Sequence, residues 1–105
     1  MKRVIDGRIY NTETATRICR LDSRSDNWGD FRWHETELYK SPRGAFFLAG
    51  EGGAMSMWAT GDGYGSSIGG SGLRVVDKGE ARYYAEAADL DPDVYEQVFG
   101  AVAIG

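Results

Sequence analysis

A four-residue turn between two strand-like segments is the feature that most constrains the fold of this chain. Residues 41–44 read Ser-Pro-Arg-Gly, which places Pro42 second and Gly44 fourth in a type I turn. The flanking segments, ETELYK and AFFLAG, are typical of strands, so residues 35–49 are predicted to form a β-hairpin. Strands come first and helices last, with no strand–helix–strand alternation. This order favours an α+β fold: a small antiparallel β-sheet of hairpins with C-terminal helices packed on one face.

Further strands are indicated on both sides of this hairpin. Asp-Gly at residues 6–7 favours a type I′ turn, because both central residues need positive φ, and it predicts a short hairpin over residues 3–10. Residues 16–21 and 73–77 also read as strands.

The glycine-rich middle of the chain is expected to be irregular. Six glycines fall within residues 61–72, so this segment is predicted to be a flexible loop. The preceding segment, AMSMWA at residues 54–59, is expected to form a short helix.

Two helices are predicted at the C-terminal end. Asp77 is a good N-cap and Glu80, three residues later, completes a capping box. The second helix is expected to start at Asp91 with Pro92 in its first turn and to stop at Gly100. We therefore expect one domain over residues 1–105, β-rich over 1–76 and helical over 77–100.

Charge is divided unevenly along the chain. Residues 1–43 hold nine Lys or Arg and seven Asp or Glu, whereas residues 44–105 hold three and nine, which gives +2 and −6 and the total of −4. An acidic surplus disfavours direct binding of nucleic acid, because neutralising phosphate supplies most of that affinity. No apolar run approaches the roughly 20 residues that cross a bilayer, and no signal peptide is recognisable, so we expect a cytoplasmic protein that does not contact a membrane.

Enzymatic motifs are weak. The glycine clusters lack the Gly-Lys pair of a phosphate-binding P-loop, so no nucleotide cofactor is expected. A single cysteine, Cys19, and a single histidine, His34, could form a nucleophile–base pair, and Glu35 with Glu37 could do acid–base work. A buried thiol, a surface histidine and solvated carboxylates are the favoured interpretations. No catalytic residue and no metal site are predicted, because one Cys and one His do not supply a zinc site.

Binding surfaces are the stronger prediction. Helix capping accounts for part of the negative charge of the acidic C-terminal segment. The remaining surplus of negative charge favours docking on a basic protein surface. Trp28 and Tyr64 lie in polar or glycine-rich segments, where core packing explains them least, and they are predicted to add aromatic contacts. The acidic partner-binding residues are expected to be Glu51, Asp62, Glu80, Glu86, Asp89, Asp91, Asp93 and Glu96.

Two stretches carry a resemblance to a known group of proteins. They are VIDGRIYNTETAT near the N-terminus and ETELYKSPRGAFFLAGEGGAMSMWA in the middle, with Gly50-Glu51-Gly52-Gly53 at the end of the central hairpin. This combination resembles a family of small, mostly uncharacterised proteins of bacteria, their phages and mobile elements. Some similar small acidic proteins are anti-CRISPR proteins, and this chain is most similar to inhibitors of type I effectors.

The resemblance implies a function as an inhibitor. A non-enzymatic acidic protein could occupy the positively charged channel of a CRISPR effector as a DNA mimic, in the cytoplasm of the bacterial host. The partner would then be an effector subunit with a basic surface. The alternative is a small regulatory or nucleic-acid-associated module that uses its basic, aromatic N-terminal half, with the side chains Arg17, Arg20, Arg24 and Arg32 around Trp28 and Trp33.

Overall fold

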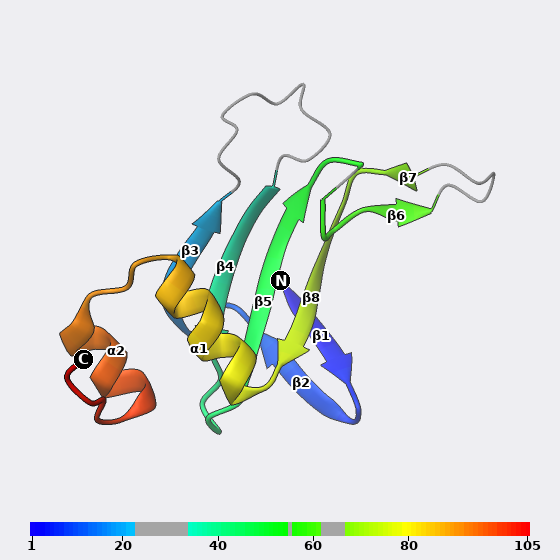
Figure 1. The fold of residues 1–105 in the computed structure, drawn as a ribbon. Helices are drawn as coiled ribbons and strands as arrows, with labels where there is room; N and C mark the ends of the chain where they lie inside the picture. The colour runs from blue at the N-terminus through cyan, green and yellow to red at the C-terminus, as the bar shows by residue number, and fades with distance from the viewer. Residues whose placement is uncertain (23–33, 55, 62–66) are drawn as a thin grey trace.

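A computed structural model describes residues 1–22, 34–54, 56–61 and 67–105, which form three antiparallel sheets and two helices (Figure 1). Strands β1 and β2 make one two-stranded sheet, β6 and β7 another, and the largest sheet has the strand order β3-β4-β5-β8. The expected α+β fold is confirmed. The elements are β1 (Lys2–Ile5), β2 (Arg8–Asn11), β3 (Thr16–Asp22), β4 (His34–Lys40), β5 (Phe46–Gly52), β6 (Thr60–Gly61), β7 (Ser67–Ile68), β8 (Gly70–Val76), α1 (Lys78–Ala87) and α2 (Pro92–Phe99).

Both predicted hairpins are present. Asp6 and Gly7 connect β1 to β2 with φ of 50° and 75°, the positive values that a type I′ turn requires. Between β4 and β5, Gly44 donates its backbone N–H to Ser41 O over 2.9 Å, and Gly44 has a φ of 89°. The turn residues read from the sequence therefore set the register of both hairpins.

The prediction for the glycine-rich segment is wrong where the structure describes it. Residues 67–68 form β7, which pairs with β6, and residues 70–72 belong to β8, which pairs with β5 along its whole length. The expected short helix at 54–59 is also absent. Its described residues form turns instead, in which Ser56 donates its backbone N–H to Gly53 O and Ala59 donates to Ser56 O.

The side chain of Trp58 explains both corrections. Gly50 and Gly72 are register partners on β5 and β8, and Thr36 is the partner of Gly50 on β4. The indole ring lies against this row: a Cβ added at Gly72 would come within 3.3 Å of two ring carbons, and one at Gly50 would lie 2.9 Å from Nε1. Nε1 donates to Thr36 Oγ1 over 2.8 Å. These glycines are strand residues because the ring needs the space that a side chain would fill.

The large sheet carries a buried cluster on each of its faces. On one face Leu38, Phe46 and Leu48 pack with Trp58 and the two helices, and Figure 1 shows α1 lying across the strands. On the other face Phe47 and Ala49 pack with Tyr10 of the N-terminal hairpin. Side chains alternate between faces along a strand, so burial of both faces explains the continuous apolar run Phe46–Ala49.

Both helices begin where the sequence predicts, and the second ends before Gly100 as expected. Asp77 accepts the backbone N–H of Glu80 over 2.7 Å, Asp91 caps α2, and Gly100 has a φ of 97°. Ala81 and Ala85 are fully buried, so α1 approaches the sheet through two small side chains. Within the described residues, neither helix has the length and apolar character needed to cross a membrane.

Gly50→Ala is expected to destabilise the protein by about 1–3 kcal/mol or more, because the new methyl group would clash with Glu35 O and Thr36 Cα and displace the indole. Gly61→Ala is the matched control, since a Cβ there meets nothing within 4 Å. We expect its effect to stay within about 0.5 kcal/mol. Urea unfolding followed by tryptophan fluorescence measures the free energy of unfolding of both variants. Equal stability of the two variants would contradict the packing of Trp58 against Gly50.

Candidate functional site

The two C-terminal helices form a strongly acidic surface. Residues 77–99 contain seven Asp or Glu against Lys78 and Arg82, a net charge of −5, and all seven acidic residues are exposed. We call these residues the acidic helix surface: Asp77, Glu80, Glu86, Asp89, Asp91, Asp93 and Glu96.

Aromatic and polar contacts hold α2 against the sheet. The rings of Phe46 and Phe99 stack with centroids 5.2 Å apart, and Tyr95 and Phe99 lie 4.8 Å apart. Lys40 Nζ lies 5.7 Å from the Phe46 ring centroid and donates to Val98 O over 3.4 Å. The second helix is therefore fixed where β4 and β5 meet their turn.

A short hydrogen-bonded relay joins the two helices at the surface. Arg82 Nε donates to Tyr95 Oη over 3.0 Å, and Tyr95 Oη donates to Glu86 Oε2 over 3.4 Å. The hydrogen bond to Tyr95 raises the pKa of Arg82 above its ordinary value. The roles of Arg82 and Tyr95 were not predicted from the sequence, in which the i,i+4 spacing of Arg82 and Glu86 is the only local indication of this contact.

Part of the acidic helix surface borders a cavity. Glu86 and Asp89 line a hollow of about 470 Å³ with Arg82 and Tyr95, over apolar residues of the α1–α2 connection and the C-terminal segment. Asp89 has a φ of 57°, a left-handed conformation that Asp tolerates better than most residues. The structure thus brings Glu86 and Asp89 together around the relay.

The carboxylates of this surface differ in what they already bind. Asp77 and Asp91 cap their helices, and Glu86 accepts from Tyr95. The side chains of Glu80, Asp89, Asp93 and Glu96 have no hydrogen-bond or ion-pair partner among the residues that the structure describes. In that part of the chain, no Lys or Arg forms an ion pair with any of the seven carboxylates, and no three potential ligands gather to hold a metal.

Glu51, by contrast, does not share a face with the helices. Gly50 faces Trp58, so the next residue along β5 points to the opposite side, where Glu51 lines a groove with Glu35 and Glu37. The structure therefore does not bring Glu51 together with the acidic helix surface. Asp62, Trp28 and Tyr64, the other residues predicted to contact a partner, lie outside the described residues.

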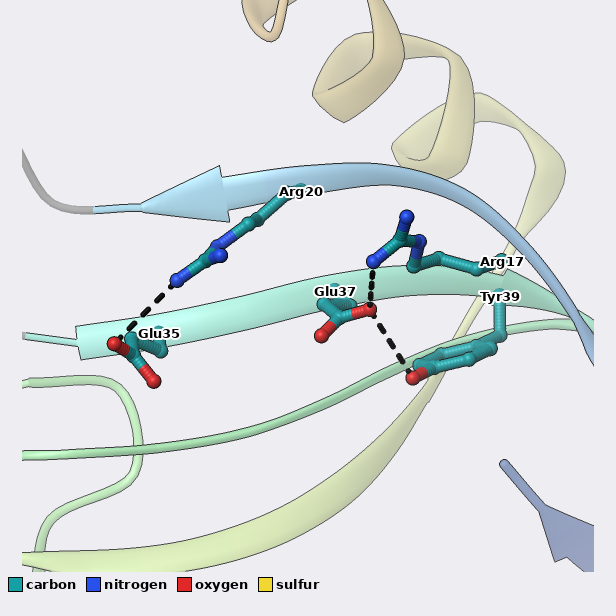
Figure 2. A network of polar contacts seen from close by, with 5 residues as sticks. All are labelled: Arg17, Arg20, Glu35, Glu37 and Tyr39. Carbon is teal, nitrogen blue, oxygen red and sulfur yellow. Dashed lines mark hydrogen bonds and ion pairs between the residues drawn. The ribbon is translucent and has the colours of Figure 1, made fainter. Parts of the chain in front are cut away.

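The sheet face around Glu35 and Glu37 carries a network of opposite charges (Figure 2). Arg17 Nη1 lies 3.4 Å from Glu37 Oε2, and Arg20 Nη2 lies 3.4 Å from Glu35 Oε1. Tyr39 donates to Glu37 Oε2 over 3.3 Å, and burial followed by the charge of Glu37 raises the pKa of this phenol. Both carboxylates considered for acid–base work are thus ion-paired, and two of the arginines proposed for a nucleic-acid module are already engaged.

The possible Cys19–His34 pair is not assembled. The register partner of Cys19 is Leu38. His34 lies four residues before Leu38, at the start of β4, which is about 13 Å away along the strand. His34 Nδ1 instead lies 2.9 Å from Thr36 Oγ1, which also accepts the N–H of Trp58. Burial raises the pKa of the Cys19 thiol above its ordinary value.

The Cys19 thiol is expected to react slowly near neutral pH. Only the thiolate is nucleophilic, so a raised pKa and partial burial should make the reaction with a disulfide reagent roughly tenfold slower in the native protein than in urea. The folded state holds this proton more tightly than the unfolded chain. Its contribution to stability is therefore present below the ordinary thiol pKa and is lost as pH rises through the raised value. Cys19→Ala should remove that part of the alkaline loss, whereas equal native and denatured reaction rates would contradict the expectation.

Comparisons of the chain with protein-family models, with curated proteins and with solved structures found no match.

Proposed function

We propose that this protein is a non-enzymatic inhibitor that docks its acidic helix surface on a basic, DNA-binding surface of another protein. The observation that carries the proposal is the set of exposed carboxylates on α1 and α2, none of which is ion-paired within the described residues. Two carboxylates of the sheet, Glu35 and Glu37, each have an arginine. The helices instead concentrate, within residues 77–99, seven carboxylates that form no ion pair with any described residue.

Such a surface suits a site built for phosphate. A DNA-binding channel gathers Lys and Arg side chains, and these cations can bind carboxylates in place of the DNA backbone. A net charge of −5 over residues 77–99 would also raise the rate of encounter with a positive groove. The Arg82–Tyr95–Glu86 relay restrains the relative position of the helices, so less conformational entropy is lost when the surface binds a partner.

The proposed partner class is a type I CRISPR effector, acting in the cytoplasm of a bacterial host. The support for this choice is the sequence resemblance of residues 4–59 to small bacterial and phage proteins, together with the acidic helix surface that would act as the DNA mimic. On this proposal, the inhibitor and the target duplex compete for one basic channel.

A charge-neutralising triple variant tests the proposal. Glu86→Gln/Asp89→Asn/Asp93→Asn removes three negative charges from the helices and keeps a residue that tolerates positive φ at position 89. Binding of target duplex by a purified type I effector, measured by gel shift with increasing amounts of protein, should then need at least about tenfold more variant for half-inhibition. Each lost charge-assisted contact is worth about 1.5–3 kcal/mol of binding free energy. Loss of a single contact would therefore already weaken binding about tenfold, which is the smallest effect expected of the triple variant.

The matched control removes the same charge elsewhere. Asp6→Asn/Glu13→Gln/Glu51→Gln also neutralises three exposed carboxylates and also includes one Asp with positive φ, but none of the three lies on the helices. It should inhibit like the original protein. The proposal fails if the helix variant keeps full potency, if both variants lose potency equally, or if the original protein leaves DNA binding unchanged.

A further inference from the structure

A second cavity lies on the other side of the sheet, between the β1–β2 turn and the β4–β5 turn. Its volume is about 490 Å³, within the roughly 300–1,000 Å³ that small-molecule sites occupy. Tyr10, Pro42 and Ala45 contribute to a lining that is mostly apolar. Tyr10 is itself buried and packs edge-on against Phe47 with centroids 5.6 Å apart, which fixes the hairpin to the sheet at this point.

Two arginines flank this cavity, one from each turn region. Arg8 begins β2 and Arg43 lies in the turn before β5, and neither side chain has a hydrogen bond or ion pair with any described residue. No Asp or Glu is among the residues that line the cavity. Most other arginines in the described chain have partners: Arg17 binds Glu37, and Arg74 donates to Tyr84 Oη over 2.8 Å. Arg3 has none among the described residues, but it does not line this cavity, so Arg8 and Arg43 are distinguished by placing two unpaired guanidinium groups at one apolar hollow.

Hydroxyl groups and rigid turns complete the arrangement. Ser41 Oγ accepts the backbone N–H of Ala45 over 3.0 Å, which leaves its own O–H able to donate into the cavity. Thr14 supplies a second hydroxyl to the lining. The two turns that carry Arg8 and Arg43 are closed by backbone hydrogen bonds, so the backbones beneath both side chains are held in place before any ligand binds.

We propose that this cavity binds an organic phosphate monoester, with the phosphate between Arg8 and Arg43 and the organic body over Tyr10, Pro42 and Ala45. Two guanidinium groups match the charge of a phosphate dianion, and each can donate two parallel N–H bonds to it. The apolar lining gives the organic part a contact that inorganic phosphate cannot make. A free nucleotide and the 5′-phosphate end of a nucleic acid share this chemistry.

Isothermal titration with adenosine monophosphate, adenosine and inorganic phosphate tests the site. The nucleotide should bind at least about tenfold more tightly than either the nucleoside or the inorganic ion, because only it uses both the cations and the apolar lining. Arg8→Gln and Arg43→Gln should each weaken its binding roughly tenfold. Arg3→Gln is the matched control: it removes the same charge from an exposed position of the same hairpin, does not line the cavity, and should bind as the original protein does.

A short oligonucleotide with and without a 5′-phosphate separates the two sources of the ligand. Tighter binding of the phosphorylated form that is lost in Arg8→Gln and Arg43→Gln would support the site and assign it to nucleic-acid ends. Selective binding of the free nucleotide would support it and assign it to small molecules. Absence of nucleotide and oligonucleotide binding at millimolar concentration, equal binding of adenosine, oligonucleotide binding that ignores the 5′-phosphate, or indifference to both substitutions would overturn the proposal.

Discussion

The contact between Trp58 and the sheet at Gly50 and Gly72, where no side chains project, determines much of this structure. The indole reaches Thr36 Oγ1 at 2.8 Å only because Gly50 and Gly72 leave the space beneath it empty. Thr36 is fully buried, and its hydroxyl is satisfied by the indole N–H, by His34 Nδ1 and, over 4.0 Å, by Met57 Sδ. One ring thus links three strands and the turn that follows β5.

The same contact fixes where the neighbouring residues point. With Gly50 beneath the indole, alternation along β5 places Glu51 on the opposite face, beside Glu35 and Glu37. It also requires β8 to include Gly72, which must lie next to Gly50 in the ladder; the strand extends further to Gly70, the register partner of Gly52. The turns at residues 53–59 then bring Trp58 back over the strand that it has just left.

Local chemistry made the turns and helix ends predictable, whereas the glycine-rich strand was not. Asp6-Gly7, Pro42 with Gly44, Asp77 and Asp91 act through backbone conformation and short-range hydrogen bonds, so their effects can be read from neighbouring residues. The sequence indicates conformational freedom at Gly70 and Gly72. In the structure Gly72 leaves room for the ring of Trp58, and Gly70 leaves room for the Trp58 backbone carbonyl and the Thr60 side chain; no local pattern shows such contacts.

The candidate site shows the same division. Composition revealed the acidic C-terminal segment, and the structure shows its carboxylates exposed and not ion-paired in the described residues. Sequence did not show that Arg17 and Arg20 neutralise Glu37 and Glu35, because that pairing depends on the register of β3 and β4, including the irregularity between Arg17 and Cys19. Counting charges along a chain therefore identifies a surplus of negative charge, whereas strand register determines which carboxylates form ion pairs.

The two buried clusters on opposite faces of the large sheet have a consequence for the two proposed sites. The acidic helix surface belongs to the side where Leu38 and Leu48 pack, and the Arg8–Arg43 cavity belongs to the side where Tyr10 and Phe47 pack. Alternate residues of β5 contribute to the two cores, so the strand backbone separates them. Substitutions of exposed charges on opposite sides share no side-chain partners in the described chain, and their effects should be close to additive. Charges on one surface can therefore be substituted while binding at the other surface serves as the control.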